Sequence, residues 1–192
     1  MCIRDSYLTS EEIEKDKEHL FSISSKLRDK NIISLIIGGP TQYYDYSDRN
    51  IQEIFSKVNY LVKENNLNLV VIPSMRTPKG TIEHAKIYFG NDHLVLDGVD
   101  KKAYLSALSI SKHIVITCDS SSMISEAALT GKPIYIATIP PKKSDKRFKN
   151  FRKLFQEMKI VRELGEKLEN WNYEKLDETN RVANIIKDKI QL

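Results

Sequence analysis

The residues best suited to chemistry gather in one stretch, from Thr117 to Ile136, where an apolar run gives way to polar side chains. Asp119 and a cluster of serines end the run, and a short helix is predicted from Met123 to Leu129. The first amides of a helix lack intrahelical acceptors and attract anions. The stretch is therefore a candidate binding site for an anionic ligand at the end of a strand.

Glu126 is the most specific single residue of this stretch. As an acidic residue in the first helical turn it could simply complement the helix dipole, by about 0.3–1 kcal/mol. A capping box does not explain it, because the residue three positions earlier is Met123 rather than a serine or threonine. Helical side chains lean toward the N-terminus, so we expect this carboxylate to face the strand ends, where it could accept hydrogen bonds from two ribose hydroxyls.

Two earlier turns add polar residues after apolar runs. Gly38 and Gly39 would let backbone amides approach a phosphate, although such a pair also suits a simple tight turn. Arg76 could form a fork on a phosphate or carboxylate, or it could be an exposed arginine without a ligand. One serine is expected to cap the helix whatever the function, and Asp119 could bind a base, a sugar or only nearby backbone. The candidate ligand-binding residues are Gly38, Gly39, Thr41, Ser74, Arg76, Thr77, Asp119, Ser120, Ser122, Ser125 and Glu126.

Several classes of site have no support in the sequence. Neither the Gly-Gly turn nor Thr130-Gly131-Lys132 has the spacing of a dinucleotide fingerprint or a P-loop, which argues against dehydrogenases and NTPases. The four histidines lack metal-ligand spacing, and Cys2 and Cys118 form no paired motif. We therefore predict no metal, no cofactor and a reducing, cytoplasmic compartment.

The bulk properties are typical of one compact domain. The chain has 192 residues, 41% of them hydrophobic, and its net charge of +4 comes from 30 basic and 26 acidic residues. Such a mild, interspersed charge does not indicate a nucleic-acid-binding protein, but it leaves anionic small molecules as ligands. No apolar run approaches the roughly 20 residues of a membrane-spanning helix, and no signal sequence is recognisable.

Alternating strands and helices must position the candidate residues. Isoleucine- and valine-rich runs predict buried strands, and segments with apolar residues on one face predict helices. The predicted strands are 32–37, 67–72, 93–96, 113–117 and 134–139, and the helices between them begin near Ser47, Thr81, Tyr104 and Met123. This order predicts an α/β fold, a Rossmann-like open parallel sheet with helices on both faces and right-handed crossovers. The polar turns then share one edge of the sheet.

The two ends of the chain are less regular. Thr9 and Glu12 form a capping box that opens an amphipathic helix reaching Lys30. The basic segment 142–153 begins another helix, and its lysines and arginines indicate either a solvated face or a contact with an anionic membrane. The apolar positions of that helix are Phe148, Phe151, Phe155 and Met158. An irregular segment holds Trp171 and Tyr173, and Asp177 could cap a final helix with Val182, Ile185, Ile186 and Ile190.

These motifs together resemble the mitochondrial fission ELM (elongated mitochondria) family of bacteria and plants. The resemblance rests on Gly38-Gly39-Pro40-Thr41, Ser74-Met75-Arg76-Thr77-Pro78, Asp119-Ser120-Ser121-Ser122-Met123-Ile124-Ser125-Glu126-Ala127 and Thr130-Gly131-Lys132-Pro133, in that order. The serine-rich motif is the most specific part. Two positions depart from the family: Met75 replaces a common second arginine, and Lys102-Ala103-Tyr104 replaces Asn-Pro-Tyr.

The resemblance implies an architecture and a ligand. Family members carry a further α/β domain ahead of the Gly-Gly strand, so residues 1–30 are expected to be a helix or linker left from a missing N-terminal domain. Residues 31–192 are expected to form a Rossmann-like domain of the nucleotide-sugar-binding type with a C-terminal helix. The family is similar to GT-B glycosyltransferases, in which a Gly-rich turn faces the diphosphate and a glutamate takes the ribose. Gly38, Gly39 and Glu126 match those positions.

Two functions follow from the resemblance. The first is a glycosyltransferase-like domain that binds a nucleotide sugar or another anionic small molecule. We nominate no catalytic residue, because GT-B enzymes usually draw the acceptor site and base from the N-terminal domain. The second is a non-catalytic adaptor at a membrane surface, as plant members are thought to be in recruiting a fission dynamin. Some members are labelled nucleoside-diphosphate-sugar epimerases, but the missing dinucleotide fingerprint argues against that chemistry.

Overall fold

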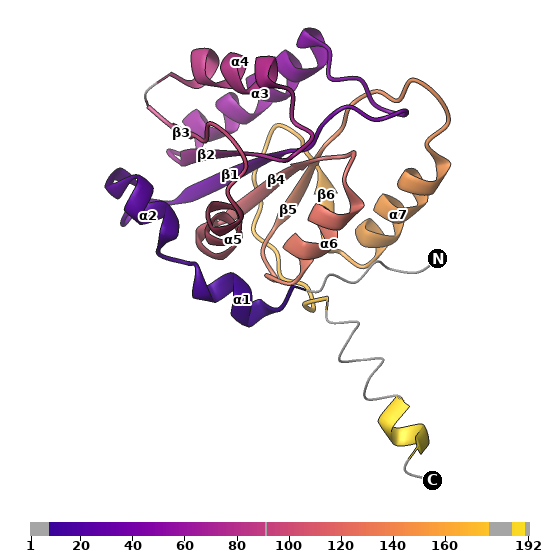
Figure 1. Ribbon diagram of the computed structural model, residues 1–192. Coiled ribbons are helices and arrows are strands. Elements are labelled where there is room, and N and C mark those ends of the chain that lie inside the picture. The colour runs from indigo at the N-terminus through magenta and orange to yellow at the C-terminus, as the bar shows by residue number, and fades with distance from the viewer. Residues whose placement is uncertain (1–7, 91, 177–185, 191–192) are drawn as a thin grey trace.

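A single parallel sheet forms the centre of the molecule. The computed structural model describes residues 8–90, 92–176 and 186–190 (Figure 1). Its six strands lie in the order β3-β2-β1-β4-β5-β6, and every neighbouring pair is parallel. The strands are β1 Ile32–Ile37, β2 Asn68–Pro73, β3 Leu94–Val95, β4 His113–Thr117, β5 Ile134–Ala137 and β6 Val161–Glu163. The predicted α/β fold with an open, Rossmann-like parallel sheet is therefore confirmed.

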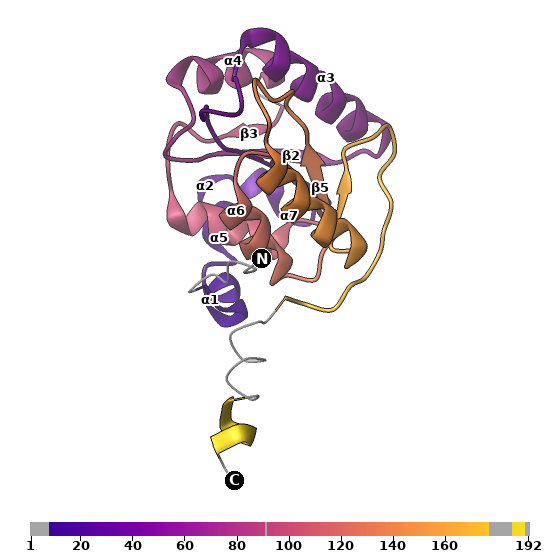
Figure 2. The ribbon, with the colours of Figure 1, turned by 90° about the vertical axis from the view of Figure 1, so that its right-hand side faces the viewer.

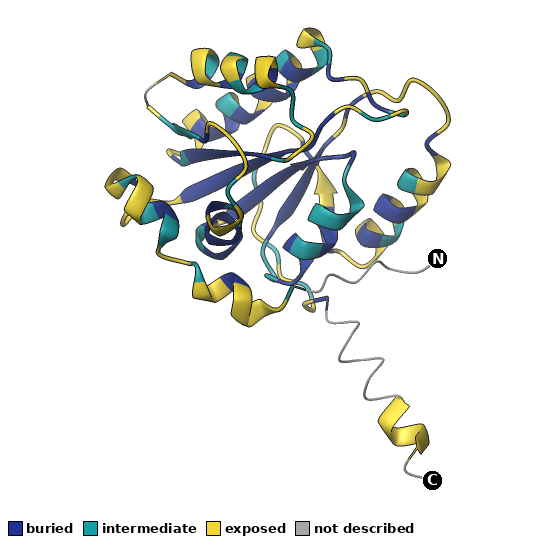
Figure 3. Cartoon of the chain, in the orientation of Figure 1, coloured by how far each residue is buried: buried dark blue, intermediate teal, exposed yellow. Residues whose placement is uncertain are grey.

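Helices cover both faces of this sheet. Figures 1 and 2 show α3 and α4 over one face and α5 and α6 over the other, with α7 beside α6. The helices are α1 Ser10–Lys15, α2 His19–Ile23, α3 Asp48–Glu64, α4 Lys79–Phe89, α5 Lys101–Ile110, α6 Ser121–Ala128 and α7 Lys146–Glu157, with a 3-10 turn, η1, at Ser25–Leu27. Because both faces are covered, the central strands β1 and β4 are buried at every residue (Figure 3).

The N-terminal region differs from its prediction. The capping box of Thr9 and Glu12 is present, but the expected single helix is divided into α1, α2 and η1. The hydroxyl of Ser106 on α5 donates to the carbonyl of Lys17 and accepts from the amide of Leu20. These tertiary bonds take backbone groups that a continuous helix would use internally, so the helix breaks where it crosses α5.

The C-terminal region also departs from its prediction in two places. Strand β6 was missed, because it is three residues long and only Val161 is buried. Met158 lies just past the end of α7 and is 39% exposed, not part of its apolar face. Of the predicted final helix, residues 177–185 lie outside the described chain, and Ile186 and Ile190 are exposed on a helical stretch at 186–190. The segment 164–176, with Trp171 and Tyr173, contains neither helix nor strand, as predicted.

Candidate functional site

The polar turns meet where the strand order reverses. Strands β1 and β4 are neighbours, and the helices that follow them, α3 and α6, leave toward opposite faces of the sheet. In open α/β sheets this arrangement opens a crevice at the carboxyl ends of the strands, where ligands bind. Gly38 and Gly39 follow β1, Arg76 follows β2, and Asp119 follows β4, so the predicted shared edge is confirmed.

Asp119 ties these turns together. Its side chain is fully buried, and its Oδ1 accepts from the hydroxyls of Tyr46 at 2.5 Å and Thr117 at 2.8 Å. Its Oδ2 accepts from the amide of Gly39 at 3.1 Å and from a guanidinium nitrogen of Arg76 at 2.7 Å. Burial and the nearby carboxylate raise the pKa of Tyr46 far above its ordinary value, so its hydroxyl donates. The predicted contact with backbone near Asp119 in the sequence is replaced by contacts with side chains and with the amide of Gly39, 80 residues away. The predicted roles in binding a base or a sugar stay predictions.

The two glycines allow close approach between turns. A Cβ on Gly38 would overlap the carboxylate of Asp119, and a Cβ on Gly39 would overlap the backbone of Arg76. The amide of Gly38 donates to Thr117 Oγ1 at 2.8 Å, so both glycine amides have protein acceptors. Thr41 is used locally too, since its Oγ1 accepts from the amides of the residues two and three positions later, as in an ST turn. The glycines are therefore explained by packing without a ligand.

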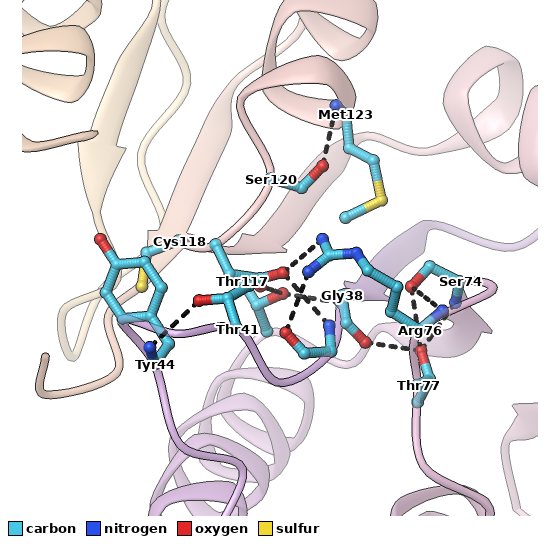
Figure 4. A network of polar contacts seen from close by, with 12 residues as sticks. Gly38, Thr41, Tyr44, Ser74, Arg76, Thr77, Thr117, Cys118, Ser120 and Met123 are labelled. Carbon is cyan, nitrogen blue, oxygen red and sulfur yellow. Dashed lines mark hydrogen bonds and ion pairs between the residues drawn. The ribbon is translucent and has the colours of Figure 1, made fainter. Parts of the chain in front are cut away.

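Arg76, in the turn after β2, has a side chain that keeps hydrogen-bond donors exposed. The Thr77 hydroxyl lies within hydrogen-bond distance of two backbone carbonyls, the last of β1 and the next one, and its Oγ1 accepts from the amide of Ser74 at 2.8 Å. Arg76 places one guanidinium nitrogen 3.2 Å from the carbonyl of Gly39 and another on Asp119, while its side chain stays 43% exposed. Figure 4 shows this guanidinium directed at its two acceptors, with Ser120 and Met123 of the start of α6 drawn beside it.

The start of α6 is two residues earlier than predicted. Ser120 is the N-cap and accepts from the amide of Met123 at 3.4 Å. Glu126 therefore lies in the second turn of the helix, so complementing the dipole in the first turn does not explain it. Ser122 is half-buried, whereas Ser125 is 2% exposed and its Oγ has no partner among the described residues.

Glu126 is held from the neighbouring helix. The hydroxyl of Tyr104 on α5 donates to Oε2 of Glu126 at 2.6 Å. Burial and this carboxylate raise the pKa of Tyr104 well above its ordinary value. No local sequence pattern pairs these two residues, although Tyr104 lies in the first turn of the helix after the third strand, as the serine-rich motif begins the helix after the fourth.

A second buried cluster was missed at the sequence level. Arg152 of α7 donates to Asp145 at 3.0 Å, to the hydroxyl of Tyr44 at 2.8 Å and to the carbonyl of Cys118 at 3.3 Å. The Tyr44 hydroxyl also donates to Asp145 at 2.5 Å. Although burial opposes it, these hydrogen bonds hold the pKa of Asp145 below its usual range. A usable signal existed, because Arg152 lies four residues after Phe148 and so falls on the apolar face of the helix.

Two other kinds of site receive no support from the described part of the chain. Within residues 8–90, 92–176 and 186–190, no three His, Cys, Asp or Glu side chains are grouped to hold a metal ion. Over the same residues, no helix has the length and apolar character needed to cross a bilayer.

Comparisons with known proteins assign this chain to a family. The model of the Mitochondrial fission ELM1 family matches residues 6–190. An uncharacterized protein of Rickettsia prowazekii is 30% identical over 171 residues, which cover 85% of this chain and 48% of that protein. The mitochondrial fission protein ELM1 of Arabidopsis thaliana is 30% identical over 111 residues, covering 56% of this chain and 24% of that protein. The matched part of the chain therefore spans about half the length of the R. prowazekii protein and about a quarter of the length of the A. thaliana protein.

Solved structures with a similar fold are UDP-N-acetylglucosamine 2-epimerases. A candidate enzyme of this kind from Listeria monocytogenes has a TM-score of 0.55 and 16% identity, over 86% of this chain and 37% of that one. The enzyme from Neisseria meningitidis, bound to UDP-GlcNAc, has a TM-score of 0.50 and 15% identity, over 91% of this chain and 40% of that one. This likeness shows the fold, a Rossmann-like domain of the GT-B type. From the family model, which matches nearly the whole chain, we conclude that the chain belongs to the mitochondrial fission ELM1 family.

Proposed function

We propose that this chain binds a nucleoside diphosphate, as part of a nucleotide sugar, at the carboxyl edge of the sheet. The observation that carries the proposal is the position of the Arg76–Asp119 network, which lies at the reversal of strand order with exposed guanidinium donors beside the start of α6. A nucleotide sugar is also the ligand of the similar N. meningitidis fold, so UDP-GlcNAc is the first ligand to test.

In this proposal the diphosphate lies between α6 and Arg76. The amides of Ser121 and Ser122 lack intrahelical acceptors, because they open the helix, and the hydroxyl of Ser122 could add a donor. Arg76 presents its remaining guanidinium N–H groups, and Glu126 accepts from the ribose hydroxyls. The other candidate residues of the strand-end turns hold these turns in place, namely Gly38, Gly39, Thr41, Ser74, Thr77, Asp119 and Ser120. Ser125 is buried within α6 and receives no role in the proposal. We assign no catalytic step to this chain.

Calorimetric titration tests the proposal. Nucleoside diphosphates and their sugars should bind folded protein with dissociation constants below about 1 mM, and the nucleosides alone should bind more weakly. Arg76→Lys should weaken diphosphate binding by about tenfold or more, because lysine keeps a cation beside Asp119 but cannot form a fork. Arg49→Lys, on the exposed surface of α3, is the matched control. Absence of binding at millimolar ligand to a folded sample would contradict the proposal.

A second candidate function rests on the outer face of α7. Lys146, Lys149 and Lys153 are exposed and lie on one side of this helix, while Phe151 and Phe155 are buried on the other. We propose that this face contacts an anionic membrane surface from the cytoplasm, as an adaptor would. The contact is electrostatic, since the apolar side of α7 packs against the body of the protein.

Sedimentation with vesicles tests this second candidate. The protein should pellet with phosphatidylcholine vesicles that contain phosphatidylserine, and added salt should release it. Replacing the three α7 lysines with glutamine should abolish pelleting, whereas the same change at Lys26, Lys57 and Lys63 should not. Equal loss in both triple variants would show that only net charge matters and would reject a specific α7 surface.

A further inference from the structure

Tyr104 and Glu126 form a bridge between the first turn of α5 and the second turn of α6. The Tyr104 hydroxyl donates to Glu126 Oε2 at 2.6 Å, a length typical of a hydroxyl bound to a carboxylate. Both helices begin at the carboxyl edge of the sheet, since α5 follows β3 and α6 follows β4. The bridged carboxylate therefore lies between two helix starts on the side of the proposed ligand.

The position of Tyr104 is itself fixed by its surroundings. Asp100, the N-cap of α5, accepts from the amide of Ala103 at 3.0 Å, and its other oxygen lies 3.0 Å from Nε2 of His19. The Tyr104 ring is partly buried and packs against the hydrophobic core, which restricts its movement. Because the pKa of Tyr104 is raised well above its ordinary value, the hydroxyl stays protonated and acts as a donor throughout the physiological range.

We propose that Tyr104 is a positioning residue that sets Glu126 to recognise the hydroxyls of a ribose, and so makes the site selective for ribonucleotides over 2′-deoxyribonucleotides. This inference rests on the proposed function. A carboxylate held in one rotamer offers its acceptors in a fixed direction, whereas a free glutamate loses rotamer freedom on binding. A ligand without the 2′-hydroxyl leaves that directed acceptor without its hydrogen bond, which penalises binding.

Matched pairs of ligands test the inference. The probes are UDP and dUDP, with the corresponding pairs of ADP, GDP and CDP, titrated calorimetrically into the full chain. The wild type should prefer the ribonucleotide by about tenfold. Tyr104→Phe keeps the ring, and it should reduce this preference to within about threefold, because it weakens the ribonucleotide more than the deoxyribonucleotide, which keeps only its 3′-hydroxyl. Tyr88→Phe is the matched control, because the Tyr88 hydroxyl also bridges two helices, to Ser56, away from this edge.

A second variant keeps the inference testable if Tyr104→Phe does not fold. Glu126→Gln should lose the same preference, and the double variant Tyr104→Phe/Glu126→Gln should lose no more than Glu126→Gln alone, because Tyr104 acts through Glu126. Equal weakening of both ligands in Tyr104→Phe, or additive losses in the double variant, would overturn the inference. So would a wild type that binds both ligands of a pair equally. A folded wild type that binds none of the diphosphates would instead contradict the proposed function itself.

Discussion

At the scale of single residues, a glycine after a strand indicates that another group packs closely against the backbone, but it does not identify that group. The sequence places Gly38 and Gly39 after a strand and suggests that their amides meet a phosphate. The structure gives the close neighbours as Asp119 and the backbone of Arg76, some eighty and forty residues further along the chain. Nothing local to the glycines could name these partners, because only the sheet brings the three turns together.

Replacing Gly39 should therefore disturb a neighbouring turn. In Gly39→Ala the new methyl group would overlap the carbonyl carbon and oxygen of Arg76, and because these are backbone atoms the two turns must separate. We expect a loss of roughly 2–4 kcal/mol in unfolding free energy, measured by urea denaturation.

Gly80→Ala is the matched control for this change. Gly80 lies in α4 with open space around its Cα, so alanine should be neutral or stabilising by up to about 1 kcal/mol. Equal stability of the Gly39 and Gly80 variants would show that the close approach is not needed.

At the scale of elements, long patterned segments could be predicted and short dependent ones could not. The largely apolar strands β1, β2 and β4 could be predicted from their own residues, and so could α3, from its one apolar face and its Ser47 cap. The break between α1 and α2 depends on a hydrogen bond to Ser106, and β6 forms by pairing with β5 at the edge of the sheet. Such elements follow from tertiary contacts, which a local pattern does not record.

The buried pair Arg152–Asp145 should couple α7 to the rest of the fold. Both side chains are about 10% exposed, and Tyr44 bonds to both. Arg152→Met should cost about 3–5 kcal/mol of unfolding free energy, because it removes the cation beside a buried carboxylate and leaves Asp145 with only the neutral Tyr44 hydroxyl. In a double-mutant cycle with Asp145→Asn, we expect a coupling energy above about 1.5 kcal/mol. The exposed pair Lys153–Glu157 on the same helix should show less than about 0.5 kcal/mol, and equal values for the two pairs would refute the coupling.

His113 should make stability depend on pH through the packing of β4 on β5. It is buried beside Tyr135, and burial, followed by the charge of Lys112, lowers its pKa. In the unfolded chain His113 binds a proton near pH 6.5, whereas in the folded chain it does so only at lower pH. The contribution of His113 to the unfolding free energy is therefore fully present above about pH 6.5 and decreases below it, by at most about 1.4 kcal/mol per pH unit.

Urea denaturation at about pH 7 and about pH 5.5 measures this contribution. His113→Phe should reduce the loss of stability on acidification. Tyr135→Phe should not, because the pKa of Tyr135 is raised to about 12 by burial and the residue does not titrate there. An unchanged acid loss in His113→Phe would assign it to other groups, among them His93, whose pKa is also lowered by burial.

At the scale of the whole molecule, the site comes from the order of the strands in the sheet, not from their order in the chain. The chain builds β1, β2 and β3 in one direction, then crosses back along α5 to place β4 on the other side of β1. Right-handed crossovers allow this return but do not require it, so the sequence could predict a shared edge without predicting the β1–β4 crevice. The residues that follow those two strands are nevertheless among the predicted candidates, together with those that follow β2.

A ligand that binds this crevice should stabilise the whole domain. Binding only to the folded state adds about 2.7 kcal/mol at a free ligand concentration of 100 times the dissociation constant. For a chain of this size that corresponds to a rise in Tm of about 5–10 °C, measured by thermal denaturation with UDP-GlcNAc. The free nucleoside uridine should raise Tm far less, because most of the proposed contacts go to the diphosphate. Arg76 also links three turns at the sheet edge, so Arg76→Lys should lower the Tm of the free protein. We expect it to reduce the ligand-dependent rise in Tm by more. If the rise in Arg76→Lys equals that of the wild type at the same ligand concentration, the ligand binds elsewhere on the molecule.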